Sequence, residues 1–297
     1  MQKIVVDNSY DRLDSYLSSN LDISRSKISK MIKDNLVLVN GKKCKASMSL
    51  DIGDTIEYEL ISEECLVEPE NIKLDIVYED DDVIVVNKTN GMVVHPAVGN
   101  KSGTLVNALM YHSKKLSSIN GEFRPGIVHR IDAYTTGLLM IAKNDKAHEF
   151  LSKQLQDKTI TRKYIALVWG VIPNDTGTIE APIMRDKKDR KKMAVGNINS
   201  KDAITHFKVI ERYSKATLIE LKLETGRTHQ IRVHMNYIGH PVVNDPVYGR
   251  RKLIDDTGQC LHAKTLGFIH PTTKKYMEFE SELPECFINI LNNFKEE

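Results

Sequence analysis

A dense group of polar and charged residues occupies positions 124–137, directly before a strongly apolar run; it reads RPGIVHRIDAYTTG. A carboxylate such as Asp132, flanked by arginine, histidine, tyrosine and threonine, can be kept ionised and oriented by donors. A nucleophile or a general base needs such a carboxylate. The alternative is a structural salt-bridge network, because polar clusters at strand ends often do no chemistry.

A second such group occupies positions 224–234 and reads ETGRTHQIRVH. Thr225 and Gly226 predict a turn, which puts Arg227 at the N-terminus of a helix. There its guanidinium could hold an anion or pair with a carboxylate. A structural ion-pair network is again the alternative.

The order His-Arg-x-Asp at 129–132 is typical of the catalytic loop of protein kinases. That loop needs an asparagine five residues after the aspartate. Gly137 stands there instead, and no glycine-rich phosphate loop precedes it. The pattern therefore excludes a kinase.

Two other chemistries fit the residues poorly. His129, His229 and His234 suggest a metal site, but His229 and His234 are five apart and do not share a helical face as a zincin pair does. We expect no metal. A glycosidase needs a second carboxylate across a cleft. Glu224 is only a nominal candidate, and nothing supports the pair.

The elements that must position these residues are mostly strands. Apolar and β-branched runs predict strands at 76–78, 83–88, 137–142, 164–168, 203–209 and 217–223. Helical spacing fits residues 104–114, 145–156, 228–237 and 284–294. Because strands and helices do not alternate regularly, we expect an α+β fold with a mixed, largely antiparallel sheet flanked by helices.

A smaller unit precedes this domain. Residues 12–34 read as two short helices, the second with Ile28, Met31 and Ile32 on one face. Asn40-Gly41 predicts a tight hairpin turn, and residues 55–60 a further strand. The predicted organisation is a small domain over 1–60, an acidic linker over 61–73 and a catalytic domain over 74–297.

Charge is unevenly distributed, although the formal net charge is only +2. Residues 61–82 are strongly acidic, whereas residues 24–45 hold seven bases against one acid. The bases are Arg25, Lys27, Lys30, Lys33, Lys42, Lys43 and Lys45. Such a cluster indicates a phosphate-binding face, with a solvated helix face as the alternative. Residues 186–192 are expected to form an exposed, charged loop.

Several motifs carry a family resemblance that covers essentially the whole chain. The sequence HRIDAYTTGLL at 129–139 resembles the central motif of the bacterial RluA/RluD pseudouridine synthase family, H-R-L-D-x-x-T-S-G-L-L. The family's tyrosine motif resembles KYIALVWG at 163–170, and its T-G-R-x-H-Q-I-R-x-H motif is matched by 225–234. GHP at 239–241, DPVYG at 245–249 and LHA at 261–263 follow in the family's order. Ile131 and Thr136 are conservative departures.

The N-terminal segment is similar to the S-four RNA-binding domain, which is named after a small-subunit ribosomal protein. The matching residues are Arg12-Leu13-Asp14, Ser24-Arg25-Ser26, Val37-x-Val39-Asn40-Gly41-Lys42 and Gly53-Asp54. This resemblance implies that Arg25, Lys27, Lys30, Lys33, Lys42 and Lys43 contact RNA phosphates.

The resemblance implies an RNA-modifying isomerase that converts uridine to pseudouridine, in large-subunit ribosomal RNA. It implies that Asp132 is the nucleophile and that Tyr164 packs on the uracil. Arg227 is the candidate partner of Asp132. Which atom Asp132 attacks stays open. A catalytically silent RNA-binding or ribosome-assembly factor on the same scaffold is a competing hypothesis.

Such an enzyme must extrude the target uridine from its RNA. Arg130 is expected to stack in the gap left behind, with His129 also at the RNA. A buried salt-bridge arginine is the alternative interpretation of Arg130. The isomerisation needs no redox change and no external group, so we expect no cofactor.

The remaining expectations concern the protein's surroundings. No apolar run approaches the roughly 20 residues of a membrane helix, and the N-terminus lacks the features of a signal peptide. Four scattered cysteines argue against a disulfide framework. We expect a cytoplasmic monomer that meets RNA and no membrane.

Overall fold

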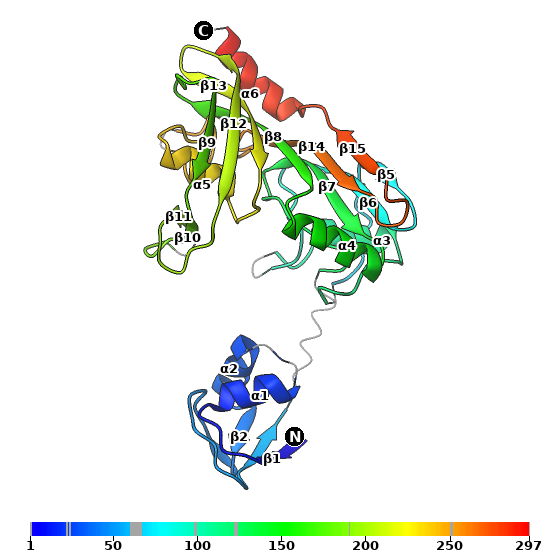
Figure 1. Ribbon diagram of the computed structural model, residues 1–297, viewed down its shortest axis with the longest axis vertical. Coiled ribbons are helices and arrows are strands. Elements are labelled where there is room, and N and C mark those ends of the chain that lie inside the picture. Colours follow the sequence, from blue (N-terminus) through cyan, green and yellow to red (C-terminus); the bar gives the residue numbers. More distant parts are fainter. Residues whose placement is uncertain are drawn as a thin grey trace. The chain divides into compact units, whose positions relative to one another are not determined.

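The computed structural model describes residues 2–21, 23, 25–59, 67–97, 100–121, 124–189, 191–249 and 252–296, without the side chains of residues 26 and 27. The chain divides into two compact units, Met1–Cys65 and Leu66–Glu297 (Figure 1). Of the predicted linker, residues 61–66 lie outside the described residues. From residue 67 onward it is attached to the larger unit, because Val67 is buried in that core and Asn107 donates to the carbonyl oxygen of Glu68.

The smaller unit is an antiparallel sheet with two helices packed against it. Its strands are β1 (Gln2–Val5), β2 (Val37–Val39), β3 (Lys42–Lys43) and β4 (Thr55–Tyr58), in the order β1-β4-β2-β3. The helices are α1 (Leu13–Leu21) and α2 (Arg25–Lys33). Strand β1, at the sheet edge, was not predicted. The hairpin at Asn40-Gly41 is confirmed, with both residues at positive φ, 50° and 73°. Ile28, Met31 and Ile32 are buried, as the spacing on α2 predicts.

The larger unit is built on one nine-stranded sheet. Its order is β5-β6-β7-β14-β8-β13-β12-β9, and β15 pairs with β14. The strands are β5 (Ile76–Glu79), β6 (Val83–Lys88), β7 (Thr136–Ala142), β8 (Thr161–Trp169), β9 (Thr176–Glu180), β12 (Ile204–Arg212), β13 (Ala216–Leu223), β14 (Leu261–Ile269) and β15 (Tyr276–Glu280). All pairs are antiparallel except β7 with β14. The predicted mixed, largely antiparallel α+β fold is confirmed.

Helices cover both faces of this sheet. They are α3 (Leu105–His112), α4 (Asp145–Gln156), α5 (Gln230–Tyr237) and α6 (Glu285–Lys295). Side chains of α3 and α5 share a core with Tyr164 and Ala166 of β8. Ile165 and Leu167 point to the opposite face, against α6. Each predicted helix is present, although α5 begins two residues later than predicted.

Several short strands of three to five residues were not predicted. They are β9, β15 and the short hairpin of β10 (Ile183–Arg185) and β11 (Met193–Val195). Of the charged residues 186–192, Arg190 lies outside the described residues and the others lie between these two strands, where the Asp186 carboxylate accepts from the backbone N–H groups of Lys188 and Asp189.

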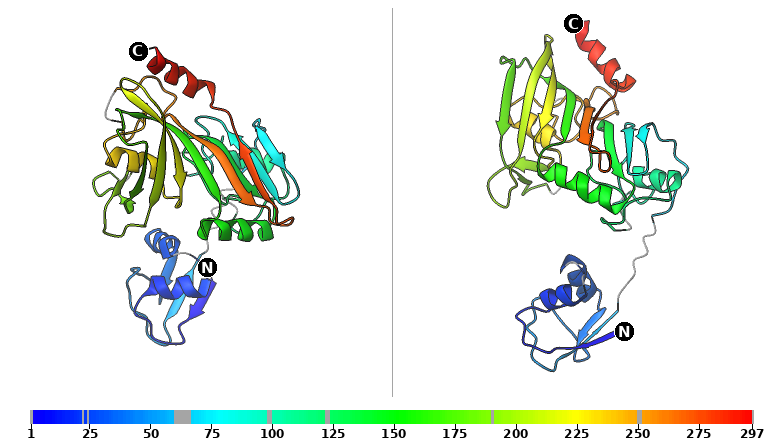
Figure 2. Two further views of the ribbon diagram at one scale, coloured as in Figure 1. Left: turned by 45° about the horizontal axis from the view of Figure 1, so that its top comes forward. Right: turned by 45° about the vertical axis from the view of Figure 1, so that its right-hand side comes forward.

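Strand β14 comes late in the chain but lies between β7 and β8, as Figures 1 and 2 both show. Gly137 makes this close approach possible. A Cβ atom there would lie 2.2 Å from the carbonyl oxygen of Ala263, and its φ of +105° is a conformation that side chains disfavour. The close contact brings the loop before β7 beside Tyr164 on β8.

Candidate active site

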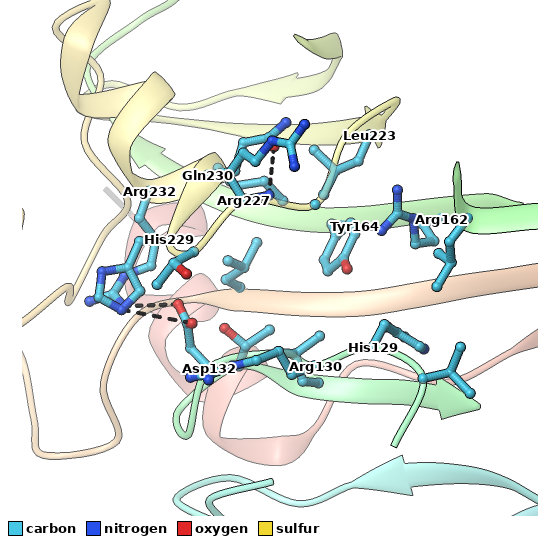
Figure 3. A pocket seen from close by; sticks show the side chains of 18 of the residues that line it. His129, Arg130, Asp132, Arg162, Tyr164, Leu223, Arg227, His229, Gln230 and Arg232 are labelled. Atoms are coloured by element: carbon cyan, nitrogen blue, oxygen red, sulfur yellow. Dashed lines mark hydrogen bonds and ion pairs between the residues drawn. The ribbon is translucent and has the colours of Figure 1, made fainter. Parts of the chain in front are cut away.

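The residues singled out from the two polar segments lie around one cavity of about 410 Å³. Its lining includes Asp132, Tyr164 and Arg227, together with His129 and Arg130 (Figure 3). A volume of this size is typical of small-molecule sites. The fold therefore brings together segments that are about 100 positions apart in the sequence.

Asp132 stands in the loop that leads into β7. Its backbone carbonyl accepts from the N–H of Thr135, which closes a turn. Buried Ile131 anchors the loop in the core on one side, and buried Thr135 on the other. The side chain of Asp132 is only 18% exposed, so its charge must be stabilised by protein groups rather than by bulk water.

Arg232 supplies that stabilisation. Its Nη1 donates to Oδ2 of Asp132 at 2.9 Å, and its Nε and Nη2 donate to the two carboxylate oxygens of Asp245 at 2.7 and 2.8 Å. Asp245 is itself held by the N–H groups of Val247 and Tyr248. The guanidinium also lies over the ring of Tyr248, 5.1 Å from its centroid. Arg232 is thus fixed before substrate arrives.

The charges of this network are mutually dependent. Burial raises the pKa of Asp245, but the guanidinium of Arg232 more than offsets this, and the net pKa lies below its usual value. Burial lowers the pKa of Arg232, but the two carboxylates raise it well above its usual value. Both groups are therefore ionised at neutral pH.

His229 also lies beside Asp132. Its Nδ1 is 2.8 Å from the hydroxyl of Tyr248, and its Nε2 is 3.8 Å from Oδ1 of Asp132. Burial lowers the pKa of His229 and Asp132 partly opposes this, so the ring is neutral at pH 7. His229 has a left-handed backbone conformation, φ 56°, and this explains why α5 begins only at Gln230.

Lys88, at the end of β6, lies under the same loop. Its Nζ donates to the carbonyl oxygens of Thr89 and Ala133 at 2.8 and 2.7 Å, and only 2% of the residue is exposed. Burial lowers the pKa of Lys88 to about 7, although the charge of Asp132 opposes the change. Because Ala133 follows Asp132, this lysine fixes the backbone that carries the carboxylate.

Tyr164 forms part of the cavity wall beside the apolar side chains of Leu223 and Leu261. The ring is buried, and burial raises the pKa of the phenol. Tyr164 therefore stays protonated at neutral pH. It offers an aromatic face and an O–H group to whatever enters the cavity.

The predicted pairing of Arg227 with Asp132 is wrong. Arg227 lines the cavity, but its Nε donates to the carbonyl oxygen of Asp202 and its backbone N–H to the side chain of Gln230. Arg232, five residues later, makes the pair instead. Sequence reasoning missed it, although an arginine between the apolar residues Ile231 and Val233 is a signal of a buried cation that needs carboxylate partners.

His129 and Arg130 occupy different environments. Nε2 of His129 accepts from the backbone N–H of Met140, and burial together with the charge of Arg162 lowers its pKa to about 3. Arg130 is exposed, and its Nη1 is 3.4 Å from Nε2 of His95. The alternative of a buried salt-bridge arginine does not hold for Arg130.

The groups considered for other chemistries lie apart from this site. Glu224 accepts from Lys158 and is paired with His206, and it is not part of the cavity lining. His234 is buried between Thr205 and the carbonyl oxygen of Ala181. Across the described part of the chain, no group of three or more histidines, cysteines or acids is arranged to hold a metal ion. Nor is any described helix long and apolar enough to cross a membrane.

The predicted phosphate-binding cations of the smaller unit differ in their partners. Arg25 is half-exposed but pairs with the buried carboxylate of Asp14 at 2.9 Å, which Arg12 also contacts. Lys30, Lys33, Lys42 and Lys43 are exposed. The side chain of Lys27 lies outside the described residues.

Comparison with known families agrees with the fold. The RNA pseudouridylate synthase family matches residues 82–237, which include Asp132, Tyr164 and Arg232. The S4 domain matches residues 11–56. The chain therefore belongs to the RNA pseudouridylate synthase family, whose members isomerise uridine in RNA, and it carries an N-terminal S4 domain.

Individual relatives extend this similarity over the whole chain. An uncharacterized RNA pseudouridine synthase of Bacillus subtilis (strain 168), YlyB, is 55% identical over 96% of this chain and 94% of its own length. Ribosomal large subunit pseudouridine synthase D of Neisseria meningitidis (serogroup A) is 45% identical over 95% of this chain and 78% of its own. The structure of human RNA Pseudouridylate Synthase Domain Containing 1 superposes with a TM-score of 0.59 at 25% identity, and covers 77% of this chain and 97% of that one.

Proposed function

We propose that this enzyme isomerises specific uridines in large-subunit ribosomal RNA, with Asp132 as the nucleophile. The observation that carries the proposal is that the guanidinium of Arg232 holds the carboxylate of Asp132. Both residues line a cavity of about 410 Å³ that Tyr164 also lines. The choice of RNA rests on the relatives whose names specify the large ribosomal subunit.

The reaction needs a carboxylate beside the target nucleotide. The C1′–N1 bond of uridine breaks, the base turns, and C5 bonds to C1′ in place of N1. C5 then loses its proton, and N1 gains one. Asp132 can take part by adding to C1′, by adding to C6, or by taking a ribose proton to form a glycal. In the first two cases the carboxylate leaves again before the product is released, and in the third it returns the proton to the ribose. In each case Arg232 orients the carboxylate and balances its charge through the hydrogen bond from Nη1 to Oδ2 of Asp132.

The enclosed position of Asp132 supports base flipping. A uridine stacked within folded RNA cannot reach a carboxylate that is only 18% exposed, so the nucleotide must leave its stack. Exposed Arg130 is adjacent in sequence to the catalytic loop and carries a planar cation that can stack on the bases left behind. Tyr164 would then pack against the uracil, and Arg227 in the cavity wall would contact the incoming RNA.

The S4 domain would contribute affinity and placement. Its exposed lysines, Lys33, Lys42 and Lys43, can contact phosphates without reading bases. Arg25 contributes less positive charge than the sequence suggests, since Asp14 neutralises part of it.

We also infer that the enzyme acts as a monomer in the cytoplasm. Asp132, Arg232, Asp245 and Tyr164 all come from one chain, so catalysis requires no second copy. The described cysteines, Cys44, Cys260 and Cys286, are free thiols, as a reducing compartment allows.

Pseudouridine mapping tests the proposed substrate. Large-subunit ribosomal RNA from cells that lack this enzyme should lose pseudouridine at one or a few positions. The purified enzyme should restore them on that RNA. An identical map in both RNAs, with activity found on transfer RNA instead, would contradict the choice of substrate.

A further inference from the structure

Arg162 is a buried cation in the wall of the active-site cavity, and the described residues supply no counterion for it. It lies on β8 two residues before Tyr164, so both side chains point to the same face of the sheet (Figure 3). The residue is 8% exposed, and its Nε has no hydrogen-bond partner. Among the described residues no carboxylate forms an ion pair with Arg162.

This arrangement is costly in the free protein. Buried guanidinium groups in folded proteins are normally paired and hydrogen-bonded, because desolvation of an unpaired charge costs several kcal/mol. Arg232, in the same cavity, has two carboxylate partners and illustrates the ordinary solution. An unpaired cation in a cavity wall can recover its desolvation cost only by binding an electron-rich ligand.

The groups around Arg162 favour such a ligand. His129 accepts from Met140 through Nε2, so its ring proton is on Nδ1 and that nitrogen is a donor. Gly226 leaves space for the guanidinium, since a Cβ atom there would lie 2.8 Å from Nη1 of Arg162. Tyr164 lies between Arg162 and Asp132 in the view of Figure 3. This end of the cavity therefore combines donors with an aromatic ring.

We propose that Arg162 binds the carbonyl oxygens of the flipped uracil and stabilises the negative charge that the base acquires during the reaction. This rests on the proposed function. When the C1′–N1 bond breaks, its electron pair stays on N1, and the charge spreads to O2 and O4. The charge disappears when C5 bonds to C1′, C5 releases its proton and N1 takes one up.

A guanidinium suits this task better than a single donor. Its several N–H groups lie in one plane and can contact different oxygens while the base turns. A backbone phosphate is the other source of anionic oxygen. It is disfavoured because the phosphates stay with the ribose chain near Asp132, whereas Arg162 lies beyond Tyr164 and is almost fully buried.

The test is single-turnover tritium release from ribosomal RNA labelled with tritium at C5 of uridine, at saturating enzyme. Arg162→Gln should lower the rate about 100-fold, the effect of removing one electrostatic donor. The dissociation constant for RNA and its salt dependence should stay unchanged. Arg162→Lys should restore part of the rate. Gly226→Ala, which crowds the guanidinium but keeps the charge, should give an intermediate loss.

Two further measurements separate this role from others. Arg162→Gln should melt at the wild-type temperature or above it, since it removes an unpaired buried charge; a clear drop in Tm would indicate a structural role. Lys222→Gln, which removes an exposed cation from neighbouring β13, should react at the wild-type rate.

A normal rate in Arg162→Gln would overturn the proposal. So would weaker binding with a reduced salt slope at an unchanged saturated rate, which would place Arg162 at a phosphate. Absence of tritium release by the wild type would contradict the proposed function itself.

Discussion

Arg232 donates to Asp132 across 100 positions of sequence, and its other two donor groups are both bound to Asp245. The carboxylate expected to do chemistry is thus held by a cation that cannot turn away from it. Such preorganisation avoids the cost of orienting charges during the reaction. It also assigns distinct functions to the two arginines of one motif, Arg227 and Arg232.

We expect Arg232→Gln to be far more damaging than Arg227→Gln. Loss of Arg232 leaves Asp132 without its ion pair and Asp245 buried and unpaired. The rate of tritium release should fall at least 100-fold, and stability should fall by about 3–5 kcal/mol. Arg227→Gln removes a hydrogen bond to the Asp202 carbonyl, and its rate should fall less than about tenfold. Equal losses in the two variants would contradict this assignment.

Lys88 should make stability depend on pH. Its pKa is about 7 when folded against an ordinary value of 10.5, so between these values the unfolded chain binds more protons and stability rises with pH. Relative to Lys88→Met, the wild type should gain about 2 kcal/mol from pH 7 to pH 9. Urea unfolding of both proteins at the two pH values measures this. If the free energy of unfolding changes equally with pH in both proteins, the burial of Lys88 does not lower its pKa.

Gly137→Ala should prevent β7 and β14 from approaching. The new Cβ would meet the carbonyl oxygen of Ala263 at 2.2 Å, and we expect a loss of about 3 kcal/mol or more. Gly239→Ala is the matched control, because Gly239 has a similar φ, +88°, but no atom within 4 Å of the added methyl group. It should cost about 1–2 kcal/mol. Equal losses of stability in the thermal melts of the two variants would contradict the close approach as the cause.

The lysines of the S4 domain should act on affinity rather than on chemistry. Replacing Lys33, Lys42 and Lys43 together by glutamine should weaken RNA binding. The slope of log K against log salt should become shallower by about 2 to 3, since each phosphate contact contributes about 0.7 to 0.9. The saturated rate should match the wild type. Filter binding over a salt series measures the slope. An unchanged slope would show that these lysines do not contact RNA phosphates.

Much of this arrangement could be predicted from sequence because local patterns determine it. The spacing of Ile28, Met31 and Ile32 predicts the buried face of α2, and Asn40-Gly41 predicts the hairpin. The density of polar residues around Asp132 predicts a site. Each of these features is determined by residues that are close to one another in the sequence.

The partner of Asp132 depends on geometry that local patterns do not contain. Arg227 and Arg232 stand in one motif, and which of them reaches Asp132 is decided by the left-handed His229 that delays the start of α5. Asp245 and Lys88 reach the site from other parts of the chain, Asp245 through two hydrogen bonds from Arg232 and Lys88 through its hydrogen bond to the carbonyl oxygen of Ala133. Strand β9 was missed because it holds a single apolar residue, Ile179, and β15 because it spans only five residues, two of them glutamates.

Asp132 is the residue on which the proposed chemistry depends most directly. Asp132→Asn keeps the size and the oxygen acceptor for Arg232 but removes the charge, so the variant should fold and bind ribosomal RNA with wild-type affinity. In the single-turnover tritium-release measurement it should release no tritium above background. Tritium release at the wild-type rate by this variant would contradict the account.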